Sequence, residues 1–323
     1  MVMAIRIHTT GGPEVMHAEE VEIGAPATGE VLVRHTAIGV NFIDTYFRSG
    51  LYAQKLPFTP GNEAAGVVEA VGDGVDNVKT GDRVVYLHSP GTYTQKRIVP
   101  AEKLVPIPES ISDEVAAAVL LKGLTAQYLL RRTFKVDAQH TILIHAAAGG
   151  VGLIAGQWAK HLHATVIGTA GSADKIALAL KHGYDHVINY RTEDFVAETL
   201  KFTGGKKLDV VYDSVGKDTF PGSLDVLKPL GLFVTFGQSS GPIPPLDVGI
   251  LNAKGSLFMT RPSIFAYNST RELLLESASE MFDLISRGVL NVAVNQRFDL
   301  KDAAKAHEAL ESRATTGATV LIP

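Results

Sequence analysis

The stretch Ile142-Leu143-Ile144-His145-Ala146-Ala147-Ala148-Gly149-Gly150-Val151-Gly152 decides the fold of this chain. It runs from an apolar strand into Ala-x-x-Gly-x-x-Gly and then into a helix whose apolar residues recur at helical spacing. Gly149 permits a tight turn, and the side-chain-poor loop lets backbone N–H groups approach a pyrophosphate at the positive end of the helix dipole. The stretch therefore predicts a dinucleotide-binding domain.

Strands and helices alternate from this point onward. We expect buried strands near 141–147, 164–169, 186–190, 208–213, 232–236 and 256–260. Six strands separated by helices indicate a doubly wound parallel sheet, which makes the fold class α/β. Ser172 and Thr192 are placed as helix N-caps, and Gly183 and Gly204 as helix stops.

The first 123 residues follow a different pattern. Short alternating runs such as 30–34 and 83–86 are punctuated by glycine and proline, which predicts a compact, mostly β domain. The tail predicts helices around 270–287 and 301–313 and a final strand at 318–322, and this lone strand needs a sheet to join. We therefore expect three parts: domain 1–123, a nucleotide domain 124–261, and a segment 262–323 that returns to the first domain.

Composition narrows the function further. The 323 residues are 46% hydrophobic, carry a net charge of -4 and contain no cysteine. No basic run attracts a polyanion, so nucleic acid is not an expected partner. No apolar segment has the length to cross a bilayer and the start does not resemble a secretory signal, so we expect a cytoplasmic protein. Without cysteine, thiolate nucleophiles and cysteine-ligated metals are excluded.

The end of the second strand indicates which dinucleotide binds. Domains that prefer NAD usually place Asp or Glu there to bind the ribose 2′-hydroxyl. This chain has Gly168-Thr169-Ala170-Gly171-Ser172-Ala173-Asp174-Lys175 instead, which offers a small turn, a hydroxyl and a cation. Such donors suit a 2′-phosphate, so the sequence predicts a preference for NADPH.

A second motif carries a family resemblance. Gly61-Asn62-Glu63-Ala64-Ala65-Gly66, followed by Gly72, resembles the signature of the medium-chain dehydrogenase/reductase superfamily. Its zinc alcohol dehydrogenases have His where Asn62 stands and further ligate zinc through cysteine. Because this chain has neither ligand, we expect no metal site.

Stretches throughout the chain are similar to the zinc-free NADPH:quinone oxidoreductases related to ζ-crystallin, especially the bacterial enzymes. They are 41–46, 48–52, 121–125, 146–152, 211–216, 236–241, 260–263 and 311–315. The resemblance implies a GroES-like mostly-β domain, a Rossmann domain with a six-stranded sheet, a cleft between them and a homodimer. It also implies NADPH-dependent reduction of a quinone.

The resemblance assigns the site residue by residue. It implies catalytic roles for Asn41, Asp44, Tyr46, Tyr52 and Arg261, with Asp44 orienting Arg261 as an ion pair. The cofactor loop residues are Ala148, Gly149, Gly150 and Val151, and the 2′-phosphate would be surrounded by Gly171, Ser172, Lys175, Tyr190 and Arg313. Lys122, Thr125 and Tyr128, expected at a helix start after the interdomain linker, would reach the nicotinamide ribose and phosphates. The remaining cofactor contacts are Asn41, Tyr46, Ser214, Val215, Phe236, Gly237, Ser239, Ser240, Ile264 and Phe265.

Two other functions stay open. A similar pocket would serve an NADPH-dependent reductase of α,β-unsaturated carbonyls (alkenals, enones or enoyl groups), in which Tyr46 or Tyr52 supplies a proton. Relatives of ζ-crystallin also serve as lens proteins or bind RNA, but the acidic charge balance of this chain disfavours RNA.

Overall fold

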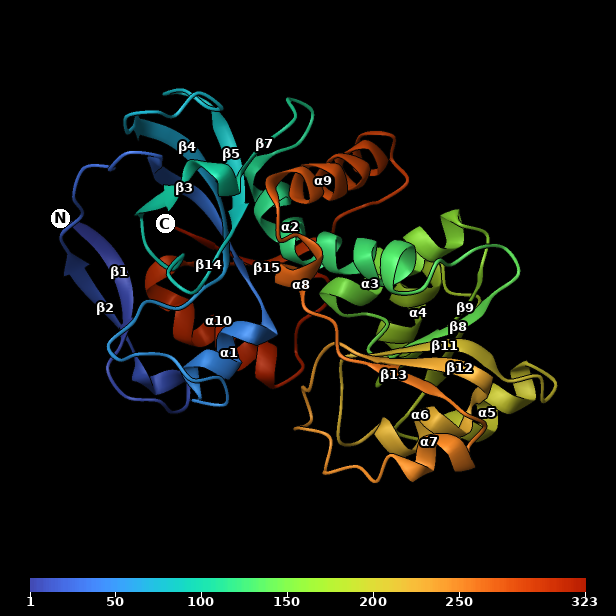
Figure 1. The fold of residues 1–323 in the computed structure, drawn as a ribbon. Coiled ribbons are helices and arrows are strands. Elements are labelled where there is room, and N and C mark those ends of the chain that lie inside the picture. The colour runs from blue at the N-terminus through green and yellow to red at the C-terminus, as the bar shows by residue number, and fades with distance from the viewer. The chain divides into compact units, whose positions relative to one another are not determined.

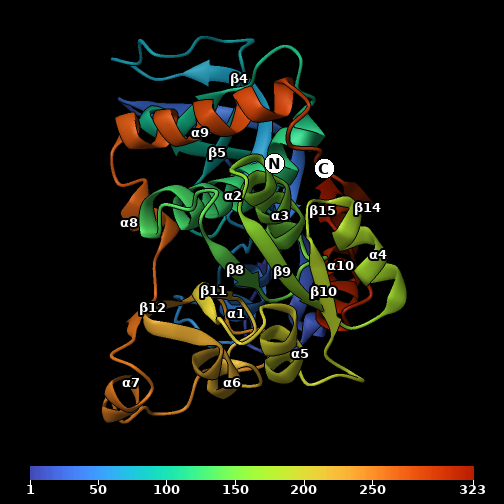
Figure 2. The same ribbon diagram turned by 90° about the vertical axis from the view of Figure 1, so that its right-hand side faces the viewer.

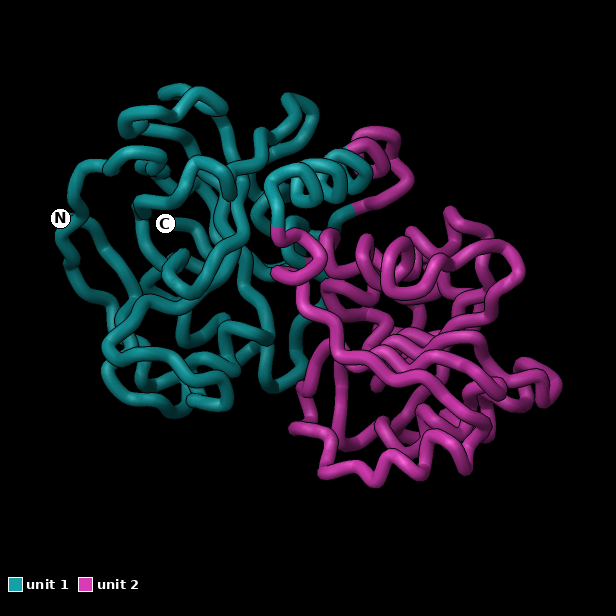
Figure 3. The backbone as a smooth tube through the Cα atoms, in the orientation of Figure 1, with its two compact units in different colours: residues 1–121, 270–282, 292–323 teal, residues 122–269, 283–291 magenta.

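The computed structural model describes all residues from 1 to 323. The chain divides into two compact units (Figure 3). Unit 1 comprises residues 1–121, 270–282 and 292–323, and unit 2 comprises residues 122–269 and 283–291. Unit 2 thus extends to residue 269 and takes in a short second segment, whereas the sequence placed its end at 261.

Unit 2 is built on the parallel sheet that the glycine loop predicted. Its strands are β8 (Thr141–Ile144), β9 (Thr165–Ala170), β10 (His186–Asn189), β11 (Leu208–Asp213), β12 (Leu227–Thr235) and β13 (Phe258–Thr260). They lie in the order β10-β9-β8-β11-β12-β13, and every neighbouring pair is parallel. The order reverses direction beside β8, so the predicted doubly wound sheet is confirmed.

Helices cover both faces of this sheet (Figures 1 and 2). The helices between and after its strands are α3 (Gly150–His161), α4 (Ala173–Lys181), α5 (Phe195–Phe202), α6 (Phe220–Asp225), α7 (Gly249–Ala253) and α8 (Ile264–Tyr267). The pair α3 and α4 lies on one face, and α5 and α6 lie on the other. The core between sheet and helices includes Leu143, Ile167, Val211 and Phe233, all fully buried.

Most of the predicted helix ends are confirmed, and one is wrong. The Ser172 hydroxyl accepts a hydrogen bond from the Lys175 N–H and caps α4, while Gly183 and Gly204 follow helices in the left-handed region. Thr192 is not an N-cap. The cap of α5 is Asp194, whose carboxylate accepts hydrogen bonds from the N–H groups of Val196 and Ala197, because residues 189–193 form a turn before the helix begins.

Unit 1 is mostly β, as predicted. A two-stranded sheet pairs β1 (Val2–Ile7) with β2 (Met16–Val21), and a seven-stranded sheet has the order β14-β15-β3-β4-β5-β7 with β6 also paired to β3. The bounds of these strands are β3 (Glu30–Val40), β4 (Glu63–Val71), β5 (Arg83–Leu87), β6 (Lys96–Pro100), β7 (Leu104–Pro106), β14 (Val294–Asp299) and β15 (Ala318–Ile322). The terminal strand β15 pairs antiparallel with β3.

The helices of unit 1 include two that lie side by side, α1 (Phe42–Arg48) and α10 (Ala303–Glu311) (Figure 1). Helix α9 (Arg271–Ser286) begins in unit 1, and short 3₁₀ turns occupy 13–15, 101–103 and 300–302. No helix in the chain is both long and apolar enough to cross a bilayer.

Helix α2 (Asp113–Tyr128) corrects another expectation. Lys122, Thr125 and Tyr128 were placed at a helix start after a linker, but α2 begins nine residues earlier, at Asp113, and continues as a π turn over Leu129–Thr133. The three residues therefore lie in the second half of a helix, on one face, and all are buried. The helix leads the chain from unit 1 into unit 2.

Candidate cofactor and substrate site

The glycine loop joins β8 to the first turn of α3. Gly149 is the N-cap of α3, and its N–H donates to the Ala146 carbonyl oxygen at 2.9 Å, which closes a tight turn. The left-handed residue of that turn is Ala146, with φ of 55°, whereas Gly149 is extended, and a Cβ on Gly149 would lie 3.2 Å from the Ala146 oxygen. Gly152 supplies the close approach: a Cβ there would lie 2.4 Å from the Ala146 oxygen.

This arrangement suits an anionic group. The first N–H groups of an α-helix have no partner inside the helix, and here they belong to a segment with almost no side chains. Ala148, Gly149, Gly150 and Val151 all lie at the positive end of the twelve-residue helix α3. The loop can therefore hold a pyrophosphate through its backbone.

The ends of β9 and β10 gather four of the predicted phosphate-binding residues. The two strands pair with Asn189 opposite Ala170, so Gly171 and Tyr190 follow neighbouring strand ends. A Cβ on Gly171 would lie 2.4 Å from the Tyr190 hydroxyl oxygen, so a side chain there would displace the tyrosine. Ser172 caps α4 and Lys175 lies in the first turn of that helix. A hydroxyl, a phenol, a cation and a helix start together fit a phosphate.

The loops after β11 and β12 interlock at the same edge of the sheet. The Ser239 N–H donates to the Ser214 oxygen at 3.1 Å, and the Ser240 N–H and hydroxyl both donate to the Val215 oxygen. A Cβ on Gly237 would lie 2.7 Å from the Ser214 oxygen, so only glycine permits this packing. The predicted contacts Ser214, Val215, Phe236, Gly237, Ser239 and Ser240 thus form one surface at the carboxyl ends of adjacent parallel strands.

A residue that the sequence analysis missed supports that surface. Asp213 is the last residue of β11 and is fully buried. Its carboxylate accepts hydrogen bonds from the Val215 N–H at 2.7 Å and the Thr219 hydroxyl at 2.9 Å. An acidic residue at the end of an otherwise apolar run is the signal that could have identified it.

Arg261 follows β13 and binds the loop after β12. Its guanidinium donates to the Thr235 hydroxyl and the Gln238 side-chain oxygen, both at 3.2 Å. Nearby, the ring of Tyr128 stacks on that of Tyr267 at 4.7 Å, and burial raises the pKa of the Tyr128 phenol. Of the two predicted residues on α8, Ile264 is buried and Phe265 is 44% exposed.

In unit 1, the predicted catalytic residues lie in and beside α1. Asn41 is the N-cap, and its N–H donates to the Asp44 carboxylate at 2.9 Å. The Tyr52 N–H donates to the Tyr46 carbonyl oxygen, and their rings meet edge to face with centroids 5.3 Å apart. Asn41 and Asp44 are buried, whereas Tyr46 and Tyr52 are half-buried. The tyrosines therefore provide an aromatic surface with two hydroxyl groups.

Glu63, which the sequence analysis quoted but gave no role, fixes the orientation of Asn41. This glutamate is fully buried on β4. Its carboxylate accepts hydrogen bonds from the Asn41 side-chain nitrogen at 2.7 Å and from the Leu121 N–H at 2.6 Å. The neighbouring Asn62 donates its side-chain N–H to the His88 carbonyl oxygen. No group of three or more His, Asp or Glu side chains in the chain is arranged to hold a metal ion.

The structure thus places the predicted residues in several groups, each within one unit. Unit 2 holds the glycine loop, the group around Lys175 and the loops with Arg261, and unit 1 holds the Asn41–Tyr52 segment. Arg313 follows α10 in unit 1 as an exposed residue with φ of 61°. The pairing of Asp44 with Arg261, the convergence of Arg313 with Lys175 and the cleft between the domains stay predictions.

Known proteins resemble this chain over its whole length. Profiles of the alcohol dehydrogenase GroES-like domain and of the zinc-binding dehydrogenases match residues 27–109 and 150–287. A quinone oxidoreductase of Salmonella typhimurium is 54% identical over 100% of both chains. A 2-haloacrylate reductase of a Burkholderia species is 47% identical over 100% of this chain and 99% of its own length. A crystal structure of an Escherichia coli quinone oxidoreductase complexed with NADPH has 53% identity and a TM-score of 0.98, covering 99% of this chain and 100% of that one.

Proposed function

The chain belongs to the quinone oxidoreductase family of the medium-chain dehydrogenase/reductase superfamily, and from this we propose that it is an NADPH-dependent quinone oxidoreductase that works without zinc. The full-length match to an enzyme solved with NADPH carries the proposal. The phosphate-binding features around the glycine loop and Lys175 support it.

When bound, NADPH supplies the reducing equivalents, and the chain itself binds and orients the cofactor and the substrate. Backbone N–H groups of Gly150 and Val151 would hold the pyrophosphate, and Ser172, Lys175 and Tyr190 would bind the 2′-phosphate. A quinone is flat and gains negative charge on oxygen as it is reduced, so it needs an aromatic surface and hydrogen-bond donors. Tyr46 and Tyr52 supply both, and the amide of Asn41 is held in a single orientation by Glu63.

A steady-state panel of acceptors tests this proposal. We expect NADPH to be oxidised with 1,4-benzoquinone and 9,10-phenanthrenequinone, and electron paramagnetic resonance would detect a semiquinone if electrons pass singly. The 47% identity to a 2-haloacrylate reductase favours a second candidate, reduction of an activated carbon–carbon double bond. Activity confined to 2-alkenals and 2-chloroacrylate would reject the quinone proposal and support that candidate.

The sheet of unit 2 offers a place for a second copy of the chain. Strand β13 lies at the edge of the sheet, with one side unpaired within the chain, and Phe258 on it is 60% exposed. An exposed apolar edge strand favours pairing with another strand. We propose a homodimer that continues the sheet across β13. A cytoplasmic location stays a prediction.

A further inference from the structure

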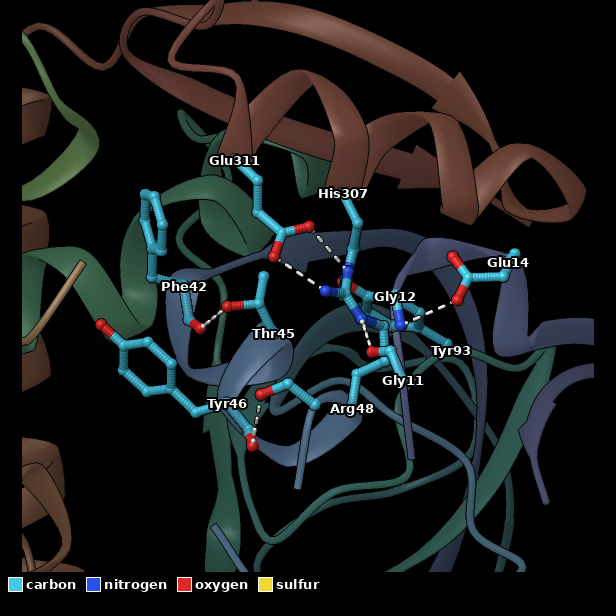
Figure 4. A network of polar contacts seen from close by, with 11 residues as sticks. Gly11, Gly12, Glu14, Phe42, Thr45, Tyr46, Arg48, Tyr93, His307 and Glu311 are labelled. Atoms are coloured by element: carbon cyan, nitrogen blue, oxygen red, sulfur yellow. Dashed lines mark hydrogen bonds and ion pairs between the residues drawn. The ribbon is translucent and has the colours of Figure 1, made fainter. Parts of the chain in front are cut away.

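A buried chain of hydrogen bonds in unit 1 joins α10 to α1 (Figure 4). Arg48, the last residue of α1, binds the Glu311 carboxylate through both terminal nitrogens at 2.8 and 2.7 Å. The same guanidinium contacts His307 Nδ1 at 3.1 Å, and His307 Nε2 lies 2.9 Å from the Tyr93 hydroxyl oxygen. That hydroxyl reaches the Asp44 carboxylate at 3.1 Å. Arg48, His307, Tyr93 and Asp44 are all at most 2% exposed.

In each hydrogen bond of this series, only one of the two groups can be the donor. A guanidinium only donates, so His307 Nδ1 must accept and the ring proton is assigned to Nε2. His307 Nε2–H then donates to the Tyr93 oxygen, and the Tyr93 hydroxyl donates to Asp44. Burial, aided by Arg48, lowers the pKa of His307 to about 3, and burial raises the pKa of the Tyr93 phenol. Neither group changes its protonation state near neutral pH.

This series of hydrogen bonds ends at the first residues of α1. The Asp44 oxygen that accepts from Tyr93 also accepts from the Asn41 N–H. On the other side of Asn41, the Glu63 carboxylate holds the side-chain amide. The start of α1 is therefore fixed from both sides, and α1 carries Tyr46 and, through a backbone bond, Tyr52.

We propose that Tyr93 and His307 are positioning residues for the substrate-binding segment 41–52, acting through Asp44. This inference rests on the proposed function, because that function assigns the segment to substrate. Neither residue contacts substrate. Helix α10 contributes to the site through them, although it lies more than 250 residues from α1 in the sequence.

Tyr93→Phe tests the role of the hydroxyl. The ring that meets His307 edge to face stays, and the substitution removes the hydroxyl that donates to Asp44 and accepts from His307 Nε2–H. We expect kcat for 1,4-benzoquinone to fall about tenfold, the loss that follows from one hydrogen bond to a charged group, while the Kd of NADPH changes less than twofold. The Asp44 carboxyl becomes easier to protonate, so the acid limb of the kcat profile moves to higher pH.

A matched control separates this role from general stabilisation. Tyr86 is another fully buried tyrosine of unit 1, and its hydroxyl bonds His35 Nε2 at 2.7 Å without any link to α1. Tyr86→Phe should leave kcat and its pH profile unchanged. If Tyr86→Phe lowers kcat as much as Tyr93→Phe does, the two hydroxyls act through stability and the proposal is overturned.

Two substitutions of His307 test which of its two hydrogen bonds supports the site. His307→Gln keeps a donor near the Nε2 position, and His307→Asn keeps an acceptor near the Nδ1 position. We expect kcat to stay within threefold for the glutamine variant and to fall about tenfold for the asparagine variant, because only glutamine still reaches Tyr93. Equal kcat values for variants with equal melting temperatures would overturn the proposal.

Amide hydrogen exchange provides a readout that does not depend on turnover. We expect peptides covering 41–52 to exchange faster in Tyr93→Phe than in the wild type, and at the wild-type rate in Tyr86→Phe. If the wild-type protein reduces no quinone, the proposed function fails, yet faster exchange in Tyr93→Phe still supports positioning. Unchanged exchange in that variant refutes positioning whatever the activity.

Discussion

Lys175 is the residue on which the proposed preference for NADPH depends most directly. It lies in the first turn of α4, whose cap is Ser172, and the Tyr190 hydroxyl lies against the neighbouring Gly171. A cation at the positive end of a helix is placed against the helix dipole. A phosphate bound at this helix end would interact favourably with both the lysine and the dipole.

Replacing Lys175 with alanine should therefore weaken NADPH binding and spare NADH. We expect the Kd of NADPH to rise about tenfold, since a charge-assisted hydrogen bond contributes roughly 1.5 kcal/mol. NADH lacks the 2′-phosphate, so its Kd should stay within twofold. Fluorescence titration with both cofactors measures this, and Lys181→Ala, at the other end of α4, is the control. Equal losses for the two cofactors would contradict the role.

The residue types of the site could be predicted from the sequence, but their partners could not. The absence of Asp or Glu directly after β9 and the presence of Lys175 in the next helix can both be read from the sequence. His307 is not, because it lies on the buried face of α10 together with Ala303 and Ala306, where a histidine is read as packing. Its partners Arg48 and Tyr93 are distant in sequence, and only the fold brings them together.

Helix starts show how local competition limits such predictions. Thr192 and Asp194 are both good N-cap residues and stand two positions apart. The turn of residues 189–193 is closed by the N–H groups of Thr192 and Glu193, which both donate to the Asn189 oxygen. The helix can begin only after that turn, and Asp194 is the residue that then accepts from two helix N–H groups.

We predict that Asp194→Ala destabilises unit 2 and that Thr192→Ala does not. Loss of an N-cap costs about 1 kcal/mol, which corresponds to a fall in melting temperature of about 2–4 °C for a unit of this size. Differential scanning calorimetry of both variants measures the difference. A similar fall for Thr192→Ala would show that the turn before α5, rather than its cap, sets the stability.

The strands of unit 2 were predictable because buried parallel strands are short apolar runs ended by turns. The start of helix α2 could not be predicted in the same way, because residues 116–120 are all fully buried. A helix covered on every side has no polar face and leaves no helical period in the sequence. The start of β12 was missed for the opposite reason: Leu230 is 67% exposed with φ of 65°, and the strand before it contains a lysine and a proline.

The two units differ in how far apart in the sequence their paired segments lie. Unit 2 is nearly continuous, whereas the seven-stranded sheet of unit 1 pairs β15 at the end of the chain with β3 near its beginning. The sequence predicts that the final strand returns to the first domain, but it does not indicate which strand it pairs with. The register of Leu321 opposite Ile38 buries both side chains fully in the core of unit 1.

Acid should destabilise the protein through its buried histidines. Burial lowers the pKa of His35 to about 4 and that of His307 to about 3, below the ordinary 6.5. Between about pH 6.5 and 4 the unfolded chain binds protons that the folded chain does not, so stability falls by about 1.4 kcal/mol per pH unit for each such histidine.

Calorimetry at pH 7.0, 6.0 and 5.0 checks this for unit 1. His35→Gln should flatten the fall in melting temperature with decreasing pH, because one titrating group is removed. His8→Gln is the control, since His8 is an exposed residue beside Glu19. An unchanged slope in His35→Gln would mean that this histidine is already protonated in the folded protein.

We expect two copies of the chain to assemble through β13. The strand is three residues long, pairs with β12 on one side only, and exposes Phe258 on the unit 2 sheet. We expect light scattering after size exclusion to give twice the 34.5 kDa mass of the chain. Phe258→Lys places a charge at this edge, and desolvating it should shift the protein to the monomer mass at micromolar concentration. Leu180→Lys changes a similarly exposed apolar residue on α4 and should leave the dimer intact. A dimer that survives Phe258→Lys would place the interface elsewhere, and a wild-type monomer would exclude it.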